Sequence, residues 1–124
     1  MAYIVYWARL IEHDDPHSEG YVGISSKSLN ERKKSHYKTA QSSRQRNVHF
    51  HNALLKYDGK VIWEVMHYEL TEDEAFAVEG IYREDINVGW NTDRGGVKAV
   101  SAEWYVLMVR MAKLRRLCVK HSLR

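Results

Sequence analysis

Two short stretches rich in β-branched and aromatic residues, 3–7 and 20–24, stand near the start of the chain and are typical of β-strands. The connection at 12–20 is polar and contains proline and glycine, which favours a hairpin. Two antiparallel strands joined in this way would bring Tyr6 and Tyr21 close together. We therefore expect the chain to begin with an aromatic hairpin.

Helical patterns follow the hairpin. Ser28 and Glu31 have the spacing of a capping box, so we expect a helix that begins at about Ser28 and ends near 41–43. Residues three, four or seven positions apart share a helix face. One face of this helix carries Leu29, Arg32, His36 and Tyr37. A second, shorter helix is predicted at 48–57, with apolar positions at Phe50, Leu54 and Leu55.

The second half of the chain contains a further strand and two further helices. Residues 60–67 are predicted to form a strand by their β-branched and aromatic content. A capping box at 71–74 opens a helix expected to reach about Asn87, and the return loop at 88–96 is rich in glycine. An amphipathic helix is predicted at 101–117. The order β-β-α-α-β-α-α predicts an α+β domain in which helices flank a three-stranded antiparallel sheet.

Glu79 occupies an unusual position in the helix that begins near residue 71. The expected core stripe of that helix is Ala75, Val78, Tyr82 and Ile86, and Glu79 lies inside it. A carboxylate on the core side of a helix is costly unless it is paired, protonated or bound to a cation. The sequence leaves two interpretations open, a buried partner for an arginine and a metal ligand.

Length and composition bound the kind of protein. The 124 residues suffice for one domain with a hydrophobic core. No apolar run approaches the roughly 20 residues of a membrane helix, and no segment resembles a secretory signal. The single cysteine, Cys118, excludes an internal disulfide and a zinc site built from cysteines. We therefore expect a cytoplasmic protein that makes no contact with a membrane.

Charge is unevenly distributed, although the net charge is only +3. Residues 27–46 contain seven Lys or Arg residues and one acid, Glu31. Residues 110–124 contain six basic residues and no acid. A basic face suggests a polyanionic partner, of which nucleic acid is the commonest. A basic helix that is simply solvated is the alternative interpretation.

Six side chains of these elements together suit the hydrolysis of a phosphodiester: Tyr6, Tyr21, Arg32, His36, Glu79 and Asn91. The reaction needs a base to activate water and positive charge to stabilise the transition state. Arg32 offers a fork of donors that matches phosphate oxygens. Glu79 could hold one Mg²⁺ or Mn²⁺, since such an ion keeps most of its waters and uses only one or two protein carboxylates. A tyrosine serves as a base only beside a cation or a proton acceptor, and His36, titrating near neutrality, could be that acceptor.

The same residues resemble those of the GIY-YIG nucleases. Residues 4–6 (IVY) and 21–23 (YVG) resemble the two motifs that name the family, with Ile4 at the place of the first motif's glycine. Arg32 and His36 follow in the R-x-x-x-H spacing of its restriction-enzyme and homing-endonuclease members. Residues 51–59 (HNALLKYDG) resemble the segment that precedes the family's third strand.

Later positions extend the resemblance, which covers about residues 3–96 in the right order. Glu79 matches the metal-binding glutamate of the family, and Asn91, in a Gly-Trp-Asn sequence, matches its late asparagine. The resemblance implies a DNA endonuclease domain at 1–96 that uses one divalent metal, Mg²⁺ or Mn²⁺, bound by Glu79. Asn91 would position the phosphate or neighbouring groups. The segment 97–124 would be a basic amphipathic helix of the same compact unit.

The resemblance also implies a division of roles among the remaining site residues. Tyr6 would contact the nucleophilic water, and His36 would relay its proton. Tyr21 would orient the phosphate or act as an alternative base, and Arg32 would stabilise the scissile phosphate. Small freestanding members of this kind suggest a phage or mobile-element enzyme, which would act in the cytoplasm of the host cell.

Contacts with double-stranded DNA are expected from the basic residues Lys27, Lys33, Lys34, Lys38, Arg44 and Arg46. His49 and His51 are weaker candidates, for which placement on the surface without a role is an equal alternative. Two other functions stay open. The first is a non-catalytic nucleic-acid-binding module that uses the basic helices 28–40 and 97–124. The second is a small regulatory or interaction protein that forms a homodimer through its C-terminal helix.

Overall fold

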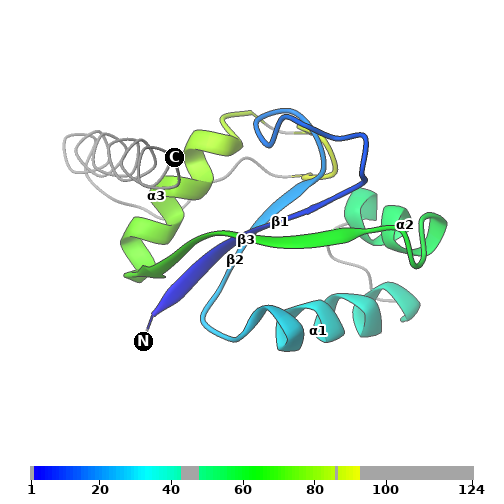
Figure 1. Cartoon of the computed structure of the whole chain (residues 1–124), viewed down its shortest axis with the longest axis horizontal. Helices are drawn as coiled ribbons and strands as arrows, with labels where there is room; N and C mark the ends of the chain where they lie inside the picture. The colour runs from blue at the N-terminus through cyan, green and yellow to red at the C-terminus, as the bar shows by residue number, and fades with distance from the viewer. Residues whose placement is uncertain (1, 43–47, 86, 93–124) are drawn as a thin grey trace.

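A computed structural model of the chain describes residues 2–42, 48–85 and 87–92. Strands β1 (Tyr3–Arg9), β2 (Tyr21–Ser25) and β3 (Ile62–Leu70) form one antiparallel sheet in the order β2-β1-β3. Helices α1 (Leu29–Gln41) and α2 (Val48–Lys56) lie on one side of the sheet, and α3 (Glu72–Tyr82) lies on the other (Figure 1). The predicted α+β class and its three-stranded antiparallel sheet are confirmed. The helix predicted at 101–117 lies outside the described residues.

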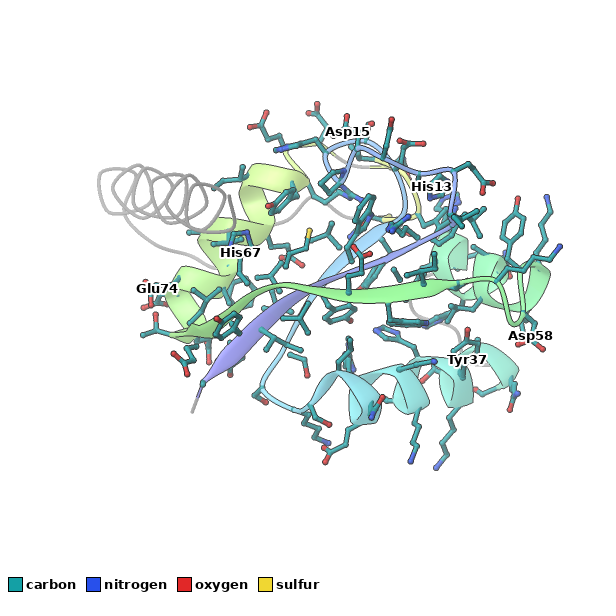
Figure 2. The ribbon with its side chains drawn as sticks, in the orientation of Figure 1. His13, Asp15, Tyr37, Asp58, His67 and Glu74 are labelled. Carbon is teal, nitrogen blue, oxygen red and sulfur yellow. The ribbon has the colours of Figure 1, made fainter. Side chains whose placement is uncertain are left out.

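The two faces of the sheet carry separate hydrophobic clusters. Side chains alternate along a strand, so Val5 and Trp7 of β1 pack toward α3, whereas Tyr6 and Ala8 pack toward α1 and α2. Tyr21 of β2 lies on the same face as Tyr6. The view with side chains shows the same division, with Tyr37 on the α1 side and His67 toward α3 (Figure 2). The predicted hairpin therefore places both motif tyrosines on the face that α1 and α2 cover.

The register between β1 and β2 explains why residue 23 is a glycine. Tyr6 of β1 is paired with Gly23 of β2, and the phenol of Tyr6 extends across that glycine. A Cβ atom at position 23 would lie 2.5 Å from Oη of Tyr6 and 2.8 Å from a ring carbon of Tyr21. Only glycine leaves room for both rings to lie over the strand.

Helix α1 begins as predicted, with the hydroxyl of Ser28 accepting a hydrogen bond from the backbone N–H of Glu31. Its predicted inner face also holds, because His36 is buried and Leu29 and Tyr37 pack against the core. These contacts fix which side chains of α1 point toward Tyr6.

In helix α2 the predicted apolar face is partly wrong. Phe50 and Leu54 are fully buried, but Leu55 is 48% exposed. Successive residues are 100° apart around the helix axis, so His51 lies 40° nearer to Phe50 than Leu55 does. His51 is 2% exposed and occupies the buried edge of this face.

Helix α3 begins at the predicted capping box but ends sooner than predicted. The Thr71 and Glu74 side chains bond each other's backbone N–H groups. The helix ends at Tyr82 instead of near Asn87, because the next residue, Arg83, leaves helical geometry and turns its side chain into the loop between β1 and β2. Among the described residues, no helix is long and apolar enough to cross a membrane.

Candidate active site

The phenol of Tyr6 is the centre of a hydrogen-bonded cluster on the α1 side of the sheet. Its Oη lies 2.7 Å from Nε2 of His36, in the middle of α1. The Nε–H of Arg32, one turn earlier in α1, donates to the same oxygen at 3.3 Å. Tyr6 is fully buried, and His36 is 3% exposed. Three of the predicted site residues, from two elements, therefore meet at one atom.

Tyr21 joins this cluster from β2. Its ring centroid lies 6.1 Å from that of Tyr6 and 5.5 Å from that of His36. Phe50 of α2 stacks on Tyr21 with parallel rings whose centroids are 3.9 Å apart. Burial raises the pKa of Tyr6 and raises that of Tyr21 well above its ordinary value. Both phenols therefore hold their protons at neutral pH, and neither acts as a base unless another group takes the proton.

The sequence led us to expect that His36 titrates near neutrality, and this expectation is wrong. Burial, the charge of Arg32 and the neighbouring His51 lower its pKa to about 3. The imidazole is thus neutral at physiological pH, with one ring nitrogen able to accept a proton. The ring is therefore in its accepting form, but its low pKa makes it a weak base while the charge of Arg32 is not offset.

Arg32 connects the buried cluster with an open cleft. The cleft has a volume of about 260 Å³ and is lined by Tyr3, Ile24, Ser25, Ser26, Lys27, Arg32 and Ser35. Within the described part of the chain the one ion pair joins Arg9 and Glu64, so Arg32 has no carboxylate partner there. Its Nε is bonded to Tyr6, whereas its terminal nitrogens make no hydrogen bond to the described residues. A cation without a counter-ion at the edge of a cleft is suited to bind an anion.

Glu79 projects from α3 and is half-buried. Burial is the main cause of the raised pKa values of Tyr21 and Tyr6, and the negative charge of Glu79 adds to both. The same charge acts on Arg83, one turn further along: burial lowers the pKa of Arg83 to about 10, while Asp15 and Glu79 oppose that change. Glu79 therefore acts electrostatically on Arg83 and on the two phenols, and its role as a metal ligand stays a prediction.

One carboxylate in this position fits a largely hydrated divalent ion. Mg²⁺ commonly keeps several waters and binds proteins through one or two carboxylates, and Glu79 would supply one. Groups of three or more His, Cys, Asp or Glu side chains that could hold a metal do not occur among the described residues. A metal held by Glu79 would thus take its other ligands from waters and from the phosphate of a substrate. Glu79 is not among the residues that line the cleft beside Arg32.

Asn91 lies beside the cluster and contacts it through the backbone of β2. Its Oδ1 accepts from the N–H of Val22 at 2.9 Å, and its Nδ2 donates to the C=O of Val22 at 2.9 Å. Oδ1 also accepts from Nε of Arg83 at 2.8 Å. The buried amide thus pairs with the strand residue between Tyr21 and Gly23. Asn91 thus holds the backbone of β2, and its predicted role in the candidate site stays a prediction.

The basic residues predicted to contact DNA have several different placements. Lys27 is exposed and lines the cleft beside Arg32. Lys34 and Lys38 are exposed on α1, and Lys33 is half-buried. Arg44 and Arg46 lie outside the described residues. Arg32, Lys27, Lys34 and Lys38 therefore belong to one basic segment that runs from the cleft along α1.

Sequence reasoning missed Arg83, and it wrongly expected His51 either to approach DNA or to lie on the surface. Arg83 is fully buried and donates to the backbone carbonyls of Pro16, Glu19, Gly20 and Tyr82. It joins the end of α3 to the loop between β1 and β2. The other residue is His51, whose Nε2 lies 3.2 Å from Nδ1 of His36. Its position beside Phe50 on the inner face of α2 is the one signal in the sequence that could have indicated its burial.

Comparison with known proteins found no matching family model, no similar curated protein and no similar solved structure.

Proposed function

We propose that the chain is a metal-dependent DNA endonuclease that hydrolyses phosphodiester bonds at the cleft beside Arg32, as its resemblance to the GIY-YIG nucleases implies. The observation that carries this proposal is the double role of Arg32. Its Nε bonds the Tyr6–His36 pair, and its guanidinium lines an open cleft without a carboxylate partner among the described residues. One side chain therefore joins a phosphate-binding position to a proton acceptor.

The cleft has the chemistry that a phosphate requires. Arg32 offers paired donors, Lys27 adds a second positive charge, and the hydroxyls of Ser26 and Ser35 can complete the hydrogen bonds. The cleft also lies at the N-terminal end of α1, where the helix dipole favours an anion. These groups would hold the scissile phosphate and stabilise the charge that develops on it.

The proton of the attacking water would leave through Tyr6. A guanidinium that turns toward a bound phosphate exposes Oη of Tyr6 to the cleft. Tyr6 then takes a proton from the water while its own proton passes to Nε2 of His36, 2.7 Å away. The resulting hydroxide attacks phosphorus, the bond between phosphorus and the leaving oxygen breaks, and that oxygen takes up a proton from solvent. A phosphate on Arg32 also offsets the cation that lowers the pKa of His36, so substrate binding makes this base stronger.

Glu79 would hold the divalent metal, Mg²⁺ or Mn²⁺. When bound, the ion would neutralise charge on the phosphate and assist departure of the leaving oxygen. Tyr21, packed between Phe50 and the Tyr6 cluster, would keep the phenol of Tyr6 in place.

Nicking of a supercoiled plasmid tests this proposal. The wild-type chain should nick DNA in Mg²⁺ or Mn²⁺ and not in EDTA. Glu79→Gln keeps the size of the side chain and removes its charge, so nicking should fall by roughly a hundredfold or more. Glu84→Gln is the matched control, because Glu84 is an exposed acid near the end of α3. Wild-type activity that does not exceed that of Glu79→Gln in any metal would refute the nuclease proposal.

A non-catalytic nucleic-acid-binding module is the second candidate, and the burial of the phenols favours it. Tyr6 is 0% exposed and Tyr21 is 7% exposed, so both phenols are buried in this conformation. Lys34 and Lys38 remain exposed along α1. This function predicts that the chain binds DNA in EDTA and does not nick it in any metal. DNA binding of Lys34→Ala/Lys38→Ala, followed by fluorescence anisotropy, would then show whether α1 is the binding surface.

A further inference from the structure

His51 extends the Tyr6–His36 pair by one more ring. Its Nε2 lies 3.2 Å from Nδ1 of His36, and Nε2 of His36 lies 2.7 Å from Oη of Tyr6. His51 is 2% exposed, whereas His49, two residues earlier on the same helix, is exposed. A strand and two helices thus supply one continuous chain of polar atoms that ends in the interior.

The direction of the protons in this chain follows from Tyr6. Its oxygen already accepts from Nε–H of Arg32, and burial keeps the phenol protonated. The Tyr6 proton therefore points to the acceptor at 2.7 Å, Nε2 of His36. A neutral imidazole that accepts at Nε2 carries its hydrogen on Nδ1, and the atom that faces this hydrogen is Nε2 of His51.

The far side of His51 gives a second, independent observation. Its Nδ1 is buried and has no hydrogen-bond partner among the described residues. A buried donor without a partner costs roughly 1–3 kcal/mol. If His51 only filled space between Phe50 and His36, an apolar side chain at this position would make the folded protein more stable. The cost is consistent with a function for the opposite ring nitrogen, which contacts His36.

We propose that His51 is a positioning residue of the candidate nuclease site, which holds His36 in the Nδ1–H tautomer that can accept the Tyr6 proton at Nε2. This inference rests on the proposed nuclease function. It follows the general arrangement in which a base is itself oriented by a third group. Without an acceptor at Nδ1, His36 would carry its hydrogen on Nε2, donate to Tyr6 and lose its ability to take the proton of that phenol.

The tautomer of His36 can be observed without any cleavage. Two-bond ¹H–¹⁵N correlation spectra of the full chain distinguish a protonated ring nitrogen from an unprotonated one. In the wild type we expect His36 to be protonated at Nδ1. In His51→Phe, which has no acceptor, we expect the hydrogen to move to Nε2. In His51→Gln the amide oxygen can accept, so the wild-type tautomer should be retained. His49→Gln is the control for an exposed histidine of the same helix.

Plasmid nicking supplies the functional half of the test. His51→Phe should nick roughly ten to a hundred times more slowly than the wild type, because a base in the wrong tautomer loses part of the ~10²–10⁴-fold of general base catalysis. His51→Gln should recover most of this loss. A purely structural role would show in thermal unfolding without this tautomer-dependent rescue.

Several outcomes would overturn the inference. A wild-type His36 protonated at Nε2 contradicts it directly, and this reading remains decisive if His51→Phe does not fold. An unchanged tautomer in His51→Phe, or nicking equal to that of the wild type, contradicts it too. If the wild-type chain does not nick DNA at all, the nuclease proposal fails, whereas the spectra still decide whether His51 sets the tautomer.

Discussion

Single atoms decide what the buried cluster can do. The oxygen of Tyr6 lies between a cation, Arg32, and a neutral imidazole, His36. The cation favours loss of the phenolic proton, but burial outweighs it, and the pKa of Tyr6 is raised. A phenol that keeps its proton and points it at a neutral base is suited to pass that proton on when a second proton arrives.

Replacement of Gly23 by alanine tests how the phenol of Tyr6 packs over this strand residue. Gly23→Ala would place Cβ 2.5 Å from Oη of Tyr6, so either the ring or β2 must move. We expect a loss of about 1–3 kcal/mol in the free energy of unfolding, measured with urea. Nicking should fall as well, since the displaced oxygen loses its contact with His36.

Gly59→Ala is the matched control for that change. Gly59 has a φ of +78° but open space around its Cβ position. It should cost about 1–2 kcal/mol through backbone strain alone. Nicking should stay at the wild-type rate, because residue 59 lies in the turn before β3. If Gly23→Ala unfolds and nicks like the wild type, the described packing of Tyr6 is wrong.

His36 should make stability depend on pH. Its pKa is about 3 in the folded chain, against an ordinary value of about 6.5 when unfolded. Above pH 6.5 the imidazole of His36 is neutral in both the folded and the unfolded state, so its titration does not change the free energy of unfolding. Below pH 6.5 only the unfolded state binds the proton, so stability falls as pH falls toward 3. From pH 7 to pH 5 this one group should remove about 2 kcal/mol.

Urea unfolding at both pH values, for the wild type and for His36→Gln, checks this expectation. The variant lacks the titrating group and should lose about 2 kcal/mol less over the same interval. Equal losses in the two proteins would mean that His36 titrates near its ordinary pKa and is not enclosed as described.

At this scale the sequence predicted which residues meet but not how they titrate. Helical spacing put Arg32 and His36 on one face of α1, and the hairpin connection brought Tyr6 and Tyr21 together. The low pKa of His36 depends on distances between α1, α2 and the sheet, which no local pattern contains. The contact of His51 with His36 depends on the same tertiary packing.

Among the elements, β2 depends on a residue far along the chain. β2 is an edge strand, and the amide of Asn91 bonds both the N–H and the C=O of Val22, as a neighbouring strand would. Arg83 bonds the same amide and the carbonyls of the loop that precedes β2. The strand that carries Tyr21 is therefore held by β1 on one side and by Asn91 on the other.

Removal of this amide should loosen β2. Asn91→Ala would leave the N–H and C=O of Val22 and the Nε of Arg83 buried without their partner. We expect a loss of about 3 kcal/mol in the free energy of unfolding and slower nicking, since Tyr21 is displaced. Asn52→Ala, at an exposed position of α2, should change the free energy by less than about 0.5 kcal/mol. An equal, small effect of both substitutions would contradict the role of Asn91.

Element starts were predictable, whereas one element end was not. The capping residues Ser28 and Thr71 act within three residues of themselves, so their pattern is visible in the sequence. The end of α3 at Tyr82 is set by Arg83, which reaches carbonyls more than 60 positions earlier in the chain. Such a long-range contact overrides the local helical pattern that continued toward Asn87.

On the scale of the whole molecule, charge is divided between regions of the chain. The cleft and α1 carry Lys27, Arg32, Lys34 and Lys38, whereas the loop between β1 and β2 and the start of α3 are acidic. This division favours one orientation of the domain on a polyanion. DNA would lie along α1 with a phosphate at the cleft.

Salt dependence tests this orientation. Binding to a DNA duplex in EDTA, followed by anisotropy, should weaken as salt rises, because contacts with phosphates release counterions. Lys34→Ala/Lys38→Ala should reduce the slope of log K against log salt by about two if each lysine contacts one phosphate. Lys56→Ala/Lys60→Ala, at exposed positions outside α1, should leave the slope unchanged. Equal slopes for all three proteins would exclude α1 as the DNA-binding surface.

Arg32 is the central residue of the proposed site, because it links the cleft to Tyr6. The most direct test is plasmid nicking by Arg32→Lys, with Lys34→Ala as the control for lost charge on α1. Lysine keeps the charge but cannot donate both to Tyr6 and in a fork to phosphate. We predict a nicking rate lower by roughly a hundredfold in Arg32→Lys, with DNA affinity in EDTA changed less than about threefold. Nicking by Arg32→Lys at the rate of the wild type would contradict the proposed site.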